Sequence, residues 1–411
     1  MNPNLKRILQ IAGLVATTIL IAWGIYRVFF KQPSPVSERP GGEGETPPGA
    51  QLPPSGERAP GAGVEPGVTG ALPPSAGTGP TLGEGAGYFQ QEPVQEIFSD
   101  FAAFPSASAE GEVRFHNVSD GKFYRVGADG KIQTLSDQVF FNVENATWAK
   151  TANKAVLAYP DGSKIIYNFD LQKQVSLPKH WEEFSFSPDA SQVAAKSIGL
   201  ATENRWLVTV NDDGTGTRLI EPLGDNANKV IVDWSPSRQT VALAQTGQAL
   251  GADRREVLFV GLNGENFKST VVEGIDFQPQ WSPTGNRLLY SVDSARSDFK
   301  PELWIVDAFG DNIGNNRRLL KLNTWAKKCT FGNEDTLFCA VPQTLPQGAG
   351  MSPEIAASTP DDLVKIDLRT GLRTDIPTGG GKHMDTVSYD SKNNKIIFTD
   401  NQRAGVFQVN L

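Results

Sequence analysis

Short apolar runs separated by polar turns recur along the last three-quarters of the chain. Each unit has an aromatic residue, a polar turn and a short apolar strand, as in WSPTGNRLLYSV at Trp281 to Val292. Related units begin around the aromatic residues Trp148, Phe186, Trp234, Phe331 and Tyr389. Their spacing of roughly 40 to 60 residues is typical of solenoids, propellers and other repeat arrays. The pattern therefore predicts one structural unit in several copies.

Each repeat is expected to form four short antiparallel strands. The two strands around the turn are followed by a third apolar run, such as PELWIVD, and then by a fourth, such as RRLLKL. The repeats show no helical spacing of apolar residues. Four strands in a repeat of roughly 40 to 50 residues are typical of a β-propeller blade. We expect the aromatic residue to fill the gap between neighbouring blades.

An opening blade without the aromatic motif precedes these repeats. Its strands are expected in the segments VQEIFSDF, EVRFHNV, KFYRVGADG and KIQTLS, the first of which begins at Val94. The last repeat stops at Leu411 after three strands, so ring closure needs a fourth strand, which Val94 to Phe101 can supply. The expected fold class is all-β, a seven-bladed β-propeller of four-stranded antiparallel blades, with six blades as the alternative.

Three of the repeats point to a known family. WSPTGNRLLYS, FSPDASQVAA and DWSPSRQTVAL resemble blades of the TolB-type, WD40-like propellers, whose first hairpin has the pattern W-S-P-D-G-x-x-[LIV]. Other repeats depart from this pattern, with Ala149-Lys150, Gly332-Asn333 and Asp390-Ser391 in place of Ser-Pro. The resemblance covers Ser99 to Leu411 and implies the propeller fold. The family contains translocation factors, protease accessory domains and envelope proteins, so it implies no single function.

Two segments before the propeller differ from it in composition. Ile8 to Phe30 is apolar, with about nineteen residues free of charge before Arg27, enough to cross a hydrocarbon core of about 30 Å. Residues 1–31 are expected to be a cytoplasmic tip and an uncleaved transmembrane helix, with a cleaved signal peptide as the alternative. Residues 32–93, rich in Pro, Gly, Ser, Glu and Ala, are expected to be a disordered linker, and residues 94–411 the propeller.

The two cysteines, Cys329 and Cys339, flank the first hairpin of one repeat at equal distances from its centre near Glu334. In a simple antiparallel register they face each other, close enough for a disulfide bond. An extracytoplasmic location would favour oxidation. The alternative is that both are small buried apolar residues.

The sequence contains few candidates for catalysis. His116, His180 and His383 each stand alone, without metal-ligand spacing, and no nucleophile elbow, metalloprotease motif or phosphate-binding loop occurs. We therefore expect no cofactor and no metal, and a binding protein more than an enzyme. A formal net charge of -8 with scattered basic residues argues against nucleic acid as a partner.

The connections between the second and third strands lengthen from the third blade to the sixth, as SIGLATEN, TGQALGADRR, DSARSDFKP and PQTLPQGAGMSPEIAASTPDD show. These connections share one face of a propeller, and loops on a rigid scaffold commonly carry binding residues. We call this set of lengthened connections the rim. Its candidate partner-binding residues are Leu200, Leu250, Arg254, Arg255, Arg296, Phe299, Leu345 and Met351, with the apolar ones expected to be exposed.

The sequence thus predicts a single-pass membrane protein whose N-terminus is cytoplasmic and whose extracytoplasmic propeller binds or scaffolds a protein or peptide in the cell envelope. The alternative is a propeller hydrolase or lyase with acidic residues at the central channel. Paired carboxylates in a deep central pocket would favour the enzyme, and a shallow, partly apolar rim would favour the binding protein.

Overall fold

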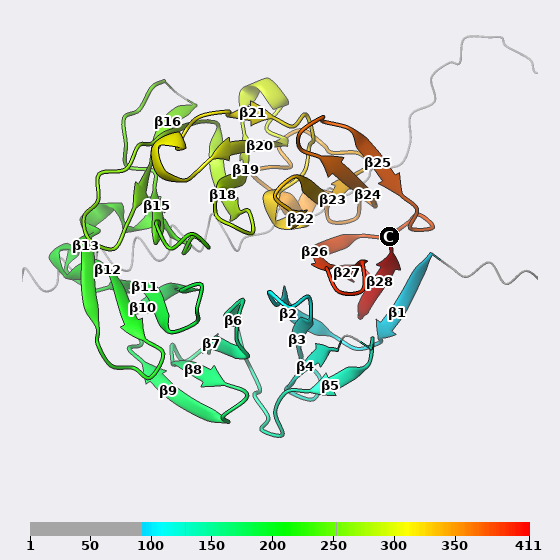
Figure 1. The fold of residues 1–411 in the computed structure, drawn as a ribbon, viewed down its shortest axis with the longest axis horizontal. Helices are drawn as coiled ribbons and strands as arrows, with labels where there is room; N and C mark the ends of the chain where they lie inside the picture. The colour runs from blue at the N-terminus through cyan, green and yellow to red at the C-terminus, as the bar shows by residue number, and fades with distance from the viewer. Residues whose placement is uncertain (1–92, 128, 252) are drawn as a thin grey trace, which may run out of the picture. The chain divides into compact units, whose positions relative to one another are not determined.

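The computed structural model describes residues 93–127, 129–251 and 253–411, which form a ring of seven four-stranded antiparallel sheets (Figure 1). Each sheet is one blade, and its strands are called A to D from the inside outward. The predicted seven-bladed, all-β propeller is confirmed. The predicted transmembrane helix and almost all of the predicted linker lie outside the described residues. In the described part of the chain, no helix is long and apolar enough to cross a membrane.

The blades follow one another in chain order. Blade 1 is β2 (Ala102–Ala107), β3 (Val113–Asn117), β4 (Lys122–Val126) and β5 (Ile132–Thr134). Blade 2 is β6 (Asn145–Trp148), β7 (Lys154–Ala158), β8 (Lys164–Asn168) and β9 (Lys173–Leu177). Blade 3 is β10 (Trp181–Phe186), β11 (Gln192–Ile198), β12 (Arg205–Asn211) and β13 (Arg218–Pro222). Blade 4 is β14 (Val230–Val232), β15 (Ala242–Ala244), β16 (Arg254–Val260) and β17 (Thr270–Glu273). Blade 5 is β18 (Ile275–Trp281), β19 (Arg287–Asp293), β20 (Pro301–Asp307) and β21 (Arg318–Leu319). Blade 6 is β22 (Cys329–Asn333), β23 (Thr336–Pro342), β24 (Asp361–Asp367) and β25 (Arg373–Ile376). Blade 7 is β26 (Met384–Asp390), β27 (Lys395–Asp400), β28 (Val406–Asn410) and β1 (Val94–Phe98). Short 3₁₀ helices in the connections are η1 (Thr202–Asn204), η2 (Gly224–Lys229), η3 (Ala295–Ser297), η4 (Gly310–Asn312), η5 (Ala326–Lys328) and η6 (Pro353–Ala356).

The Ser-Pro turns of the repeats share one hydrogen-bond pattern. In blade 5 the Ser282 carbonyl accepts the Gly285 N–H at 2.9 Å, and the Ser282 hydroxyl accepts the Arg287 N–H at 3.0 Å. Ser187 and Ser235 make the equivalent bonds in blades 3 and 4. Gly285 has φ +76°, a left-handed conformation that costs glycine least. The motif therefore specifies the turn that joins strands A and B.

The motif aromatics lie between blades, as predicted. The Trp148 indole donates to the Phe104 carbonyl of blade 1 at 2.9 Å, and the Trp281 indole donates to the Asp233 carbonyl of blade 4 at 3.2 Å. The main apolar clusters of the described residues each join two neighbouring blades. The core is therefore distributed around the ring, and each blade depends on both neighbours.

Basic residues near the start of strand B add a second contact between blades. Each crosses to a backbone carbonyl in the turn between strands A and B of the next blade. The contacts are Arg114 to Ala152 at 2.6 Å, Lys154 to Ala190 at 3.2 Å and Arg287 to Glu334 at 2.6 Å. Arg114 is fully buried, and its guanidinium lies 4.7 Å from the centre of the Trp148 ring. Burial lowers the pKa of Arg114 to about 10.

The N-terminal strand closes the ring. β1 pairs antiparallel with β28, from Val94 opposite Val409 to Phe98 opposite Val406, and so becomes strand D of blade 7. This confirms the predicted closing strand. The expectation that the same segment also supplies a strand of the opening blade is wrong, because blade 1 is formed by β2 to β5. The sequence does not predict β2, the innermost strand of blade 1. Pro105 removes a backbone donor there, and a bulge that holds Phe104 at φ +53° interrupts the apolar alternation.

Cys329 and Cys339 are buried and pair directly between β22 and β23, as the equal spacing predicts. The structure contains a disulfide bond between them, with the two Cα atoms 4.0 Å apart. The bond fastens the first hairpin of blade 6, beside the longest connection of the rim.

A chain that begins at Ser99 is expected to be less stable than one that begins at Pro93, because it lacks β1. Val94 is buried in the apolar cluster that contains Phe407 and Val409, and burial of one such side chain contributes about 1.5 to 3 kcal/mol. The backbone edge of β28 would also become free. Urea unfolding of the two chains measures the difference, and equal free energies of unfolding would contradict closure by β1.

Replacement of both cysteines by alanine should lower the free energy of unfolding by about 2 to 3 kcal/mol, because the unfolded chain loses a short covalent loop. Denaturant titrations with and without reductant measure this change. Reductant should destabilise the parent chain and leave the Cys329→Ala, Cys339→Ala variant unaffected. Two free thiols in the unfolded, unreduced parent chain would contradict the bond.

Candidate functional site

The rim comprises the BC connections of blades 3 to 6, at the end of the propeller where BC and DA connections meet. In the structure these connections are residues 199–204, 245–253, 294–300 and 343–360. Three of them contain a short 3₁₀ helix, namely η1, η3 and η6. Local hydrogen bonds therefore give these long connections a defined shape.

The connections of blades 5 and 6 are joined by backbone hydrogen bonds. The Gly348 N–H donates to the Asp298 carbonyl at 2.9 Å, and the Gly350 N–H donates to the Phe299 carbonyl at 2.8 Å. Asp298 and Phe299 both have positive φ, so the connection of blade 5 turns sharply to present these carbonyls. The two connections form one surface.

The far end of the blade 6 connection reaches blade 7. His383 Nε2 lies 3.0 Å from the Ser358 carbonyl, and Gln402 Nε2 donates to the Ala357 carbonyl at 3.3 Å. Beneath the connection, Leu345 packs on a buried cluster of Trp325, Ala349 and Ala356. Residues 343–360 therefore span three blades and carry a small apolar core of their own.

The predicted rim residues do not all share one environment. Leu200, Leu250 and Met351 are exposed, whereas Phe299 and Leu345 are half-buried and differ from the expected exposure. Phe299 lies where the two connections meet, and Leu345 covers Trp325. Arg255 donates to the Gln245 side chain at 3.4 Å.

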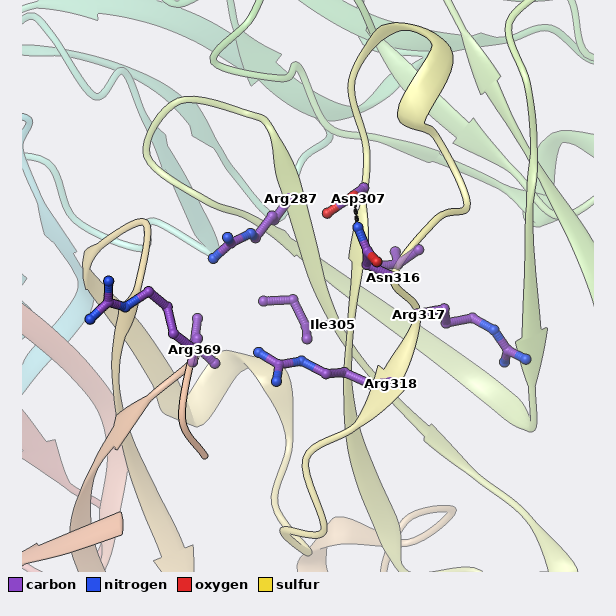
Figure 2. A pocket seen from close by; sticks show the side chains of 9 residues that line it. Arg287, Ile305, Asp307, Asn316, Arg317, Arg318 and Arg369 are labelled. Carbon is purple, nitrogen blue, oxygen red and sulfur yellow. Dashed lines mark hydrogen bonds between the residues drawn. The ribbon is translucent and has the colours of Figure 1, made fainter. Parts of the chain in front are cut away.

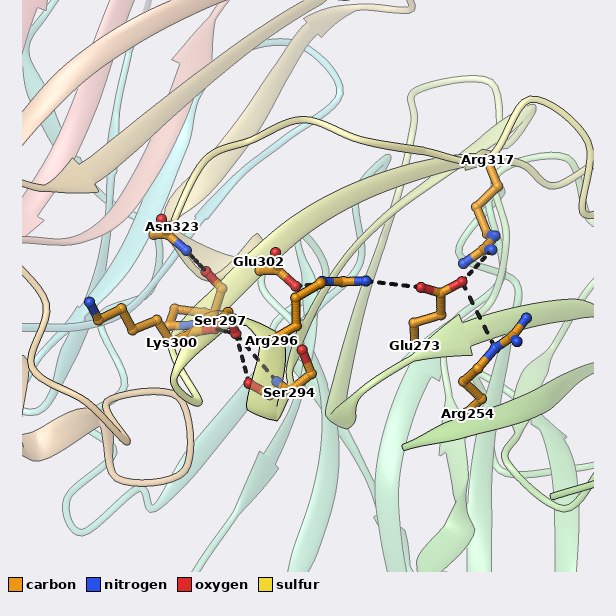
Figure 3. Close-up of polar contacts among 10 residues, drawn as sticks. Arg254, Glu273, Ser294, Arg296, Ser297, Lys300, Glu302, Arg317 and Asn323 are labelled. Carbon is orange, nitrogen blue, oxygen red and sulfur yellow. Dashed lines mark hydrogen bonds and ion pairs between the residues drawn. The ribbon is translucent and has the colours of Figure 1, made fainter. Parts of the chain in front are cut away.

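Glu273, at the end of β17, brings three arginines together (Figure 3). Its carboxylate lies 2.8 Å from Arg317, 3.0 Å from Arg296 and 3.9 Å from Arg254. The hydrogen bond from Arg317, supported by those from Arg296 and the charge of Arg254, holds the pKa of Glu273 below its ordinary value. Glu302 binds the other side of Arg296 at 2.6 Å.

An aromatic ring supports this charge cluster. The Trp304 ring lies 5.0 Å from the Arg317 guanidinium and 5.5 Å from that of Arg296, and Tyr290 stacks on Trp304 with 6.3 Å between ring centres. Cation–π contacts of this kind hold an arginine side chain in place. Arg296 and Arg317 are therefore positioned by Trp304 of blade 5 as well as by their acidic partners.

Two predicted residues, Arg254 and Arg296, thus bind the same carboxylate, that of Glu273. The sequence did not point to the residues that hold them there. Glu273, Glu302, Trp304 and Arg317 carry no motif, and Glu273 belongs to a different blade from Arg296. The lone acidic residue at the end of STVVE is a weak signal by itself. Only the neighbouring arginines reveal its role.

A second group of exposed apolar residues lies at the BC and DA connections of blade 1. The Val118 N–H donates to the Phe101 carbonyl at 3.0 Å. A Cβ on Gly121 would lie 2.8 Å from Val139 Cγ1 and 3.0 Å from Phe141 Cδ1. Because Val118 and Gly121 belong to the same connection, the four exposed apolar residues lie on connections that contact one another. We call Phe101, Val118, Val139 and Phe141 the blade 1 patch.

Asp293 is a buried acid beneath the rim. Its side chain is covered by Gly350, where an added Cβ would lie 2.2 Å from Asp293 Cγ, and its Oδ2 has no hydrogen-bond partner among the described residues. Burial, with a contribution from the charge of Asp276, raises its pKa to about 7. In the described part of the chain, no group of three or more His, Cys, Asp or Glu is arranged to hold a metal ion.

The raised pKa of Asp293 predicts a pH-dependent stability. The folded state holds this proton more tightly than the unfolded chain, whose Asp has a pKa of 3.8, so the free energy of unfolding should fall as pH rises from 3.8 to about 7. Asp293→Asn should be more stable than the parent at pH 8, by about 1 to 2 kcal/mol after solvent screening, and nearly equal to it below pH 4.

Urea titrations at several pH values measure this difference, because the contributions of other acids cancel between parent and variant. Asp276→Asn is the control, since removal of that neighbouring charge should lower the pKa of Asp293. An equal pH dependence in the parent and in Asp293→Asn would contradict the proton held on this residue.

The comparisons with known proteins agree with this fold. No protein-family model and no curated protein matches the sequence. Among solved structures, the β-propeller domain of Cps50 (Swd1) from Myceliophteria thermophila is 12% identical, with TM-score 0.52, covering 77% of this chain and 98% of that chain. Oligogalacturonate lyase from Vibrio parahaemolyticus is 9% identical, with TM-score 0.51, covering 77% and 93%. TolB from Acinetobacter baumannii is 13% identical, with TM-score 0.42, covering 66% and 64%.

The Cps50 (Swd1) structure is itself described as a β-propeller domain, in agreement with the predicted fold. At these identities the likeness concerns the fold alone. The described chain is a seven-bladed β-propeller of four-stranded antiparallel blades.

Proposed function

We propose that this chain is a membrane-tethered, extracytoplasmic β-propeller that binds a protein or peptide partner as a binding or scaffolding module of the cell envelope. The docking surface is the end of the propeller that carries the BC and DA connections. The observation that supports it most is the gathering of exposed apolar side chains on these connections. Apolar surface that is clustered, with polar residues around it, is typical of interaction sites.

Exposed large apolar residues are unevenly distributed between the two ends of the propeller. At the BC and DA connections they are Leu200, Leu250, Met351, Ile355, Phe101, Val118, Val139 and Phe141. At the opposite end they are Leu171, Phe309 and Leu372 in CD turns, and Leu411 just after β28. The longer connections therefore expose more apolar surface than the opposite turns do.

The structure of the rim also supports a binding role. Residues 343–360 are held on both sides, so Met351 and Ile355 project from a surface that is already ordered. Arg254 and Arg296 are half exposed while their guanidinium groups remain bound to Glu273. Preorganised apolar and arginine side chains reduce the entropy lost on binding. A peptide with apolar anchors and acidic neighbours suits this surface.

The proposed location rests on the sequence and on the disulfide. Residues 1–31 supply the anchor and residues 32–93 the tether, both outside the described residues. A bond between Cys329 and Cys339 is typical of a protein that folds in an oxidising compartment.

The second candidate is a hydrolase or lyase that uses acidic residues at the central channel. It is favoured by Asp293, whose raised pKa near neutral suits a general acid or base, and by the neighbouring Asp276. Asp293 is only 1% exposed, however, and Gly350 covers its carboxyl group. A substrate would have to displace the blade 6 connection to reach it, so the geometry favours binding over catalysis.

A variant with Met351→Glu and Ile355→Glu should lose the partner, because two charges would replace exposed apolar contacts. Chemical crosslinking in intact membranes, followed by quantitative mass spectrometry, measures recovery of the proteins bound to the full-length chain. We expect at least about a tenfold loss, the equivalent of 1.4 kcal/mol or more.

Leu372→Glu is the matched control, because Leu372 is 66% exposed in the CD turn of the same blade, at the opposite end of the strands. Its partners should be those of the parent chain. The proposal fails if the double variant retains every partner, or if Leu372→Glu loses them to the same degree.

A further inference from the structure

A cleft lies between blades 5 and 6 at the other ends of their strands, where A joins B and C joins D (Figure 2). Its volume is about 450 Å³, which falls within the range of small-molecule sites. Its floor is apolar and buried, formed by Ile305 of β20 and by Leu368 just after β24. The rim and the blade 1 patch contribute no residue to this lining.

The wall of the cleft is strongly basic. Four arginines line it, and the one acidic lining residue is Asp307, whose carboxylate accepts a hydrogen bond from Asn316 at 2.7 Å. Basic residues therefore outnumber acidic ones in the lining. The chain as a whole has a formal net charge of -8, so the positive charge of the cleft is opposite in sign to the net charge of the protein. A cleft of one sign above an apolar floor focuses the field on a ligand of opposite charge.

Two of the arginines have structural partners. Arg287 donates to the Glu334 carbonyl at 2.6 Å and pairs with Asp335 at 3.0 Å, the contact between blades described above. Arg317 turns its guanidinium away from the other arginines in Figure 2 and binds Glu273. Their charges are therefore largely balanced by the protein itself.

The other two arginines are not balanced in this way. Arg318, at the start of β21, and Arg369, in the CD turn of blade 6, are exposed. Neither makes an ion pair or a side-chain hydrogen bond within the described residues. In Figure 2 the Arg318 side chain extends across the cleft past Ile305, towards the base of Arg369. The N–H groups of each guanidinium can therefore donate hydrogen bonds in pairs to carboxylate or phosphate oxygens.

We propose that this cleft binds a small polyanion, a molecule with two or more carboxylate or phosphate groups. Arg318 and Arg369 bind the anionic groups, Arg287 adds positive potential at the inner wall, and the apolar part of the ligand rests on Ile305 and Leu368. The site joins two blades, so a bound ligand also links blade 5 to blade 6. The inference does not rest on the proposed function, because its residues belong to the opposite ends of the strands.

Isothermal titration of the full-length chain with citrate and, separately, with pyrophosphate tests the site. Citrate represents a carboxylate ligand and pyrophosphate a phosphate ligand, so the tighter of the two identifies the preferred chemistry. We expect saturable binding of at least one probe at one site, with Kd below about 1 mM at low salt. Binding should weaken as salt is added, because exposed charges are screened.

Arg318→Gln with Arg369→Gln should weaken binding of that probe by at least about tenfold, since both charge-assisted contacts are lost. Both side chains are exposed, so the fold should be kept, and the melting temperature confirms it. Should the double variant unfold, each single variant is expected to lose about threefold or more.

Arg238→Gln is the matched control. Arg238 lies in the turn between strands A and B of blade 4, is 63% exposed and pairs with Asp189. Its replacement removes one positive charge outside the cleft, as each single variant does inside it. It should bind the probe within about twofold of the parent. The proposal is overturned if neither probe binds up to about 5 mM, or if Arg238→Gln weakens binding as much as the double variant.

Discussion

The pairing of β1 with β28 is the constraint on which the rest of the structure depends. Each main apolar cluster belongs to two neighbouring blades, so no blade buries its faces alone. Strand D of blade 7 comes from the opposite end of the described chain, and the ring closes only when Val94 meets Val409. Closure removes the open edge that a stack of sheets would expose. It also fixes every blade relative to the next.

That fixed geometry allows one connection to be shared among blades. Residues 343–360 begin on blade 6, bond to Asp298 and Phe299 of blade 5 and end against His383 and Gln402 of blade 7. This arrangement buries a polar group, because Asp293 lies beneath Gly350 and burial raises its pKa. Such a connection can hold its shape only if the three blades do not move relative to one another.

Arginine serves two different purposes at the two ends of blade 5. Near the rim, Arg296 and Arg317 are bound by Glu273 and lie on Trp304, so their charges are balanced and their positions set. In the cleft between blades 5 and 6, Arg318 and Arg369 have no such partners in the described residues. The first arrangement builds a defined surface for contact, and the second leaves positive charge available to a ligand. Arg317 belongs to both, with its backbone at the cleft and its side chain at Glu273.

Much of the fold could be predicted because its signals are local. The aromatic, the Ser-Pro turn and the apolar strand of each repeat lie within about a dozen residues, and their hydrogen bonds form within one hairpin, as at Ser282. The opposition of Cys329 and Cys339 follows from the register of a single turn. The strand that departs from this local pattern, β2 with Pro105 and its bulge, is the one that the sequence does not predict.

The sequence by itself therefore determined the repeat, a closed ring of seven or six blades, its closing strand and the face on which long connections accumulate. Only the tertiary structure decided which side chains meet there. Glu273 reaches Arg296 from another blade, Leu345 turns inward onto Trp325, and Arg318 and Arg369 line one cleft from two neighbouring blades. The physical reason is that hairpin pairing follows from neighbouring residues, whereas contacts between blades depend on the closed ring, which brings together residues with no shared period.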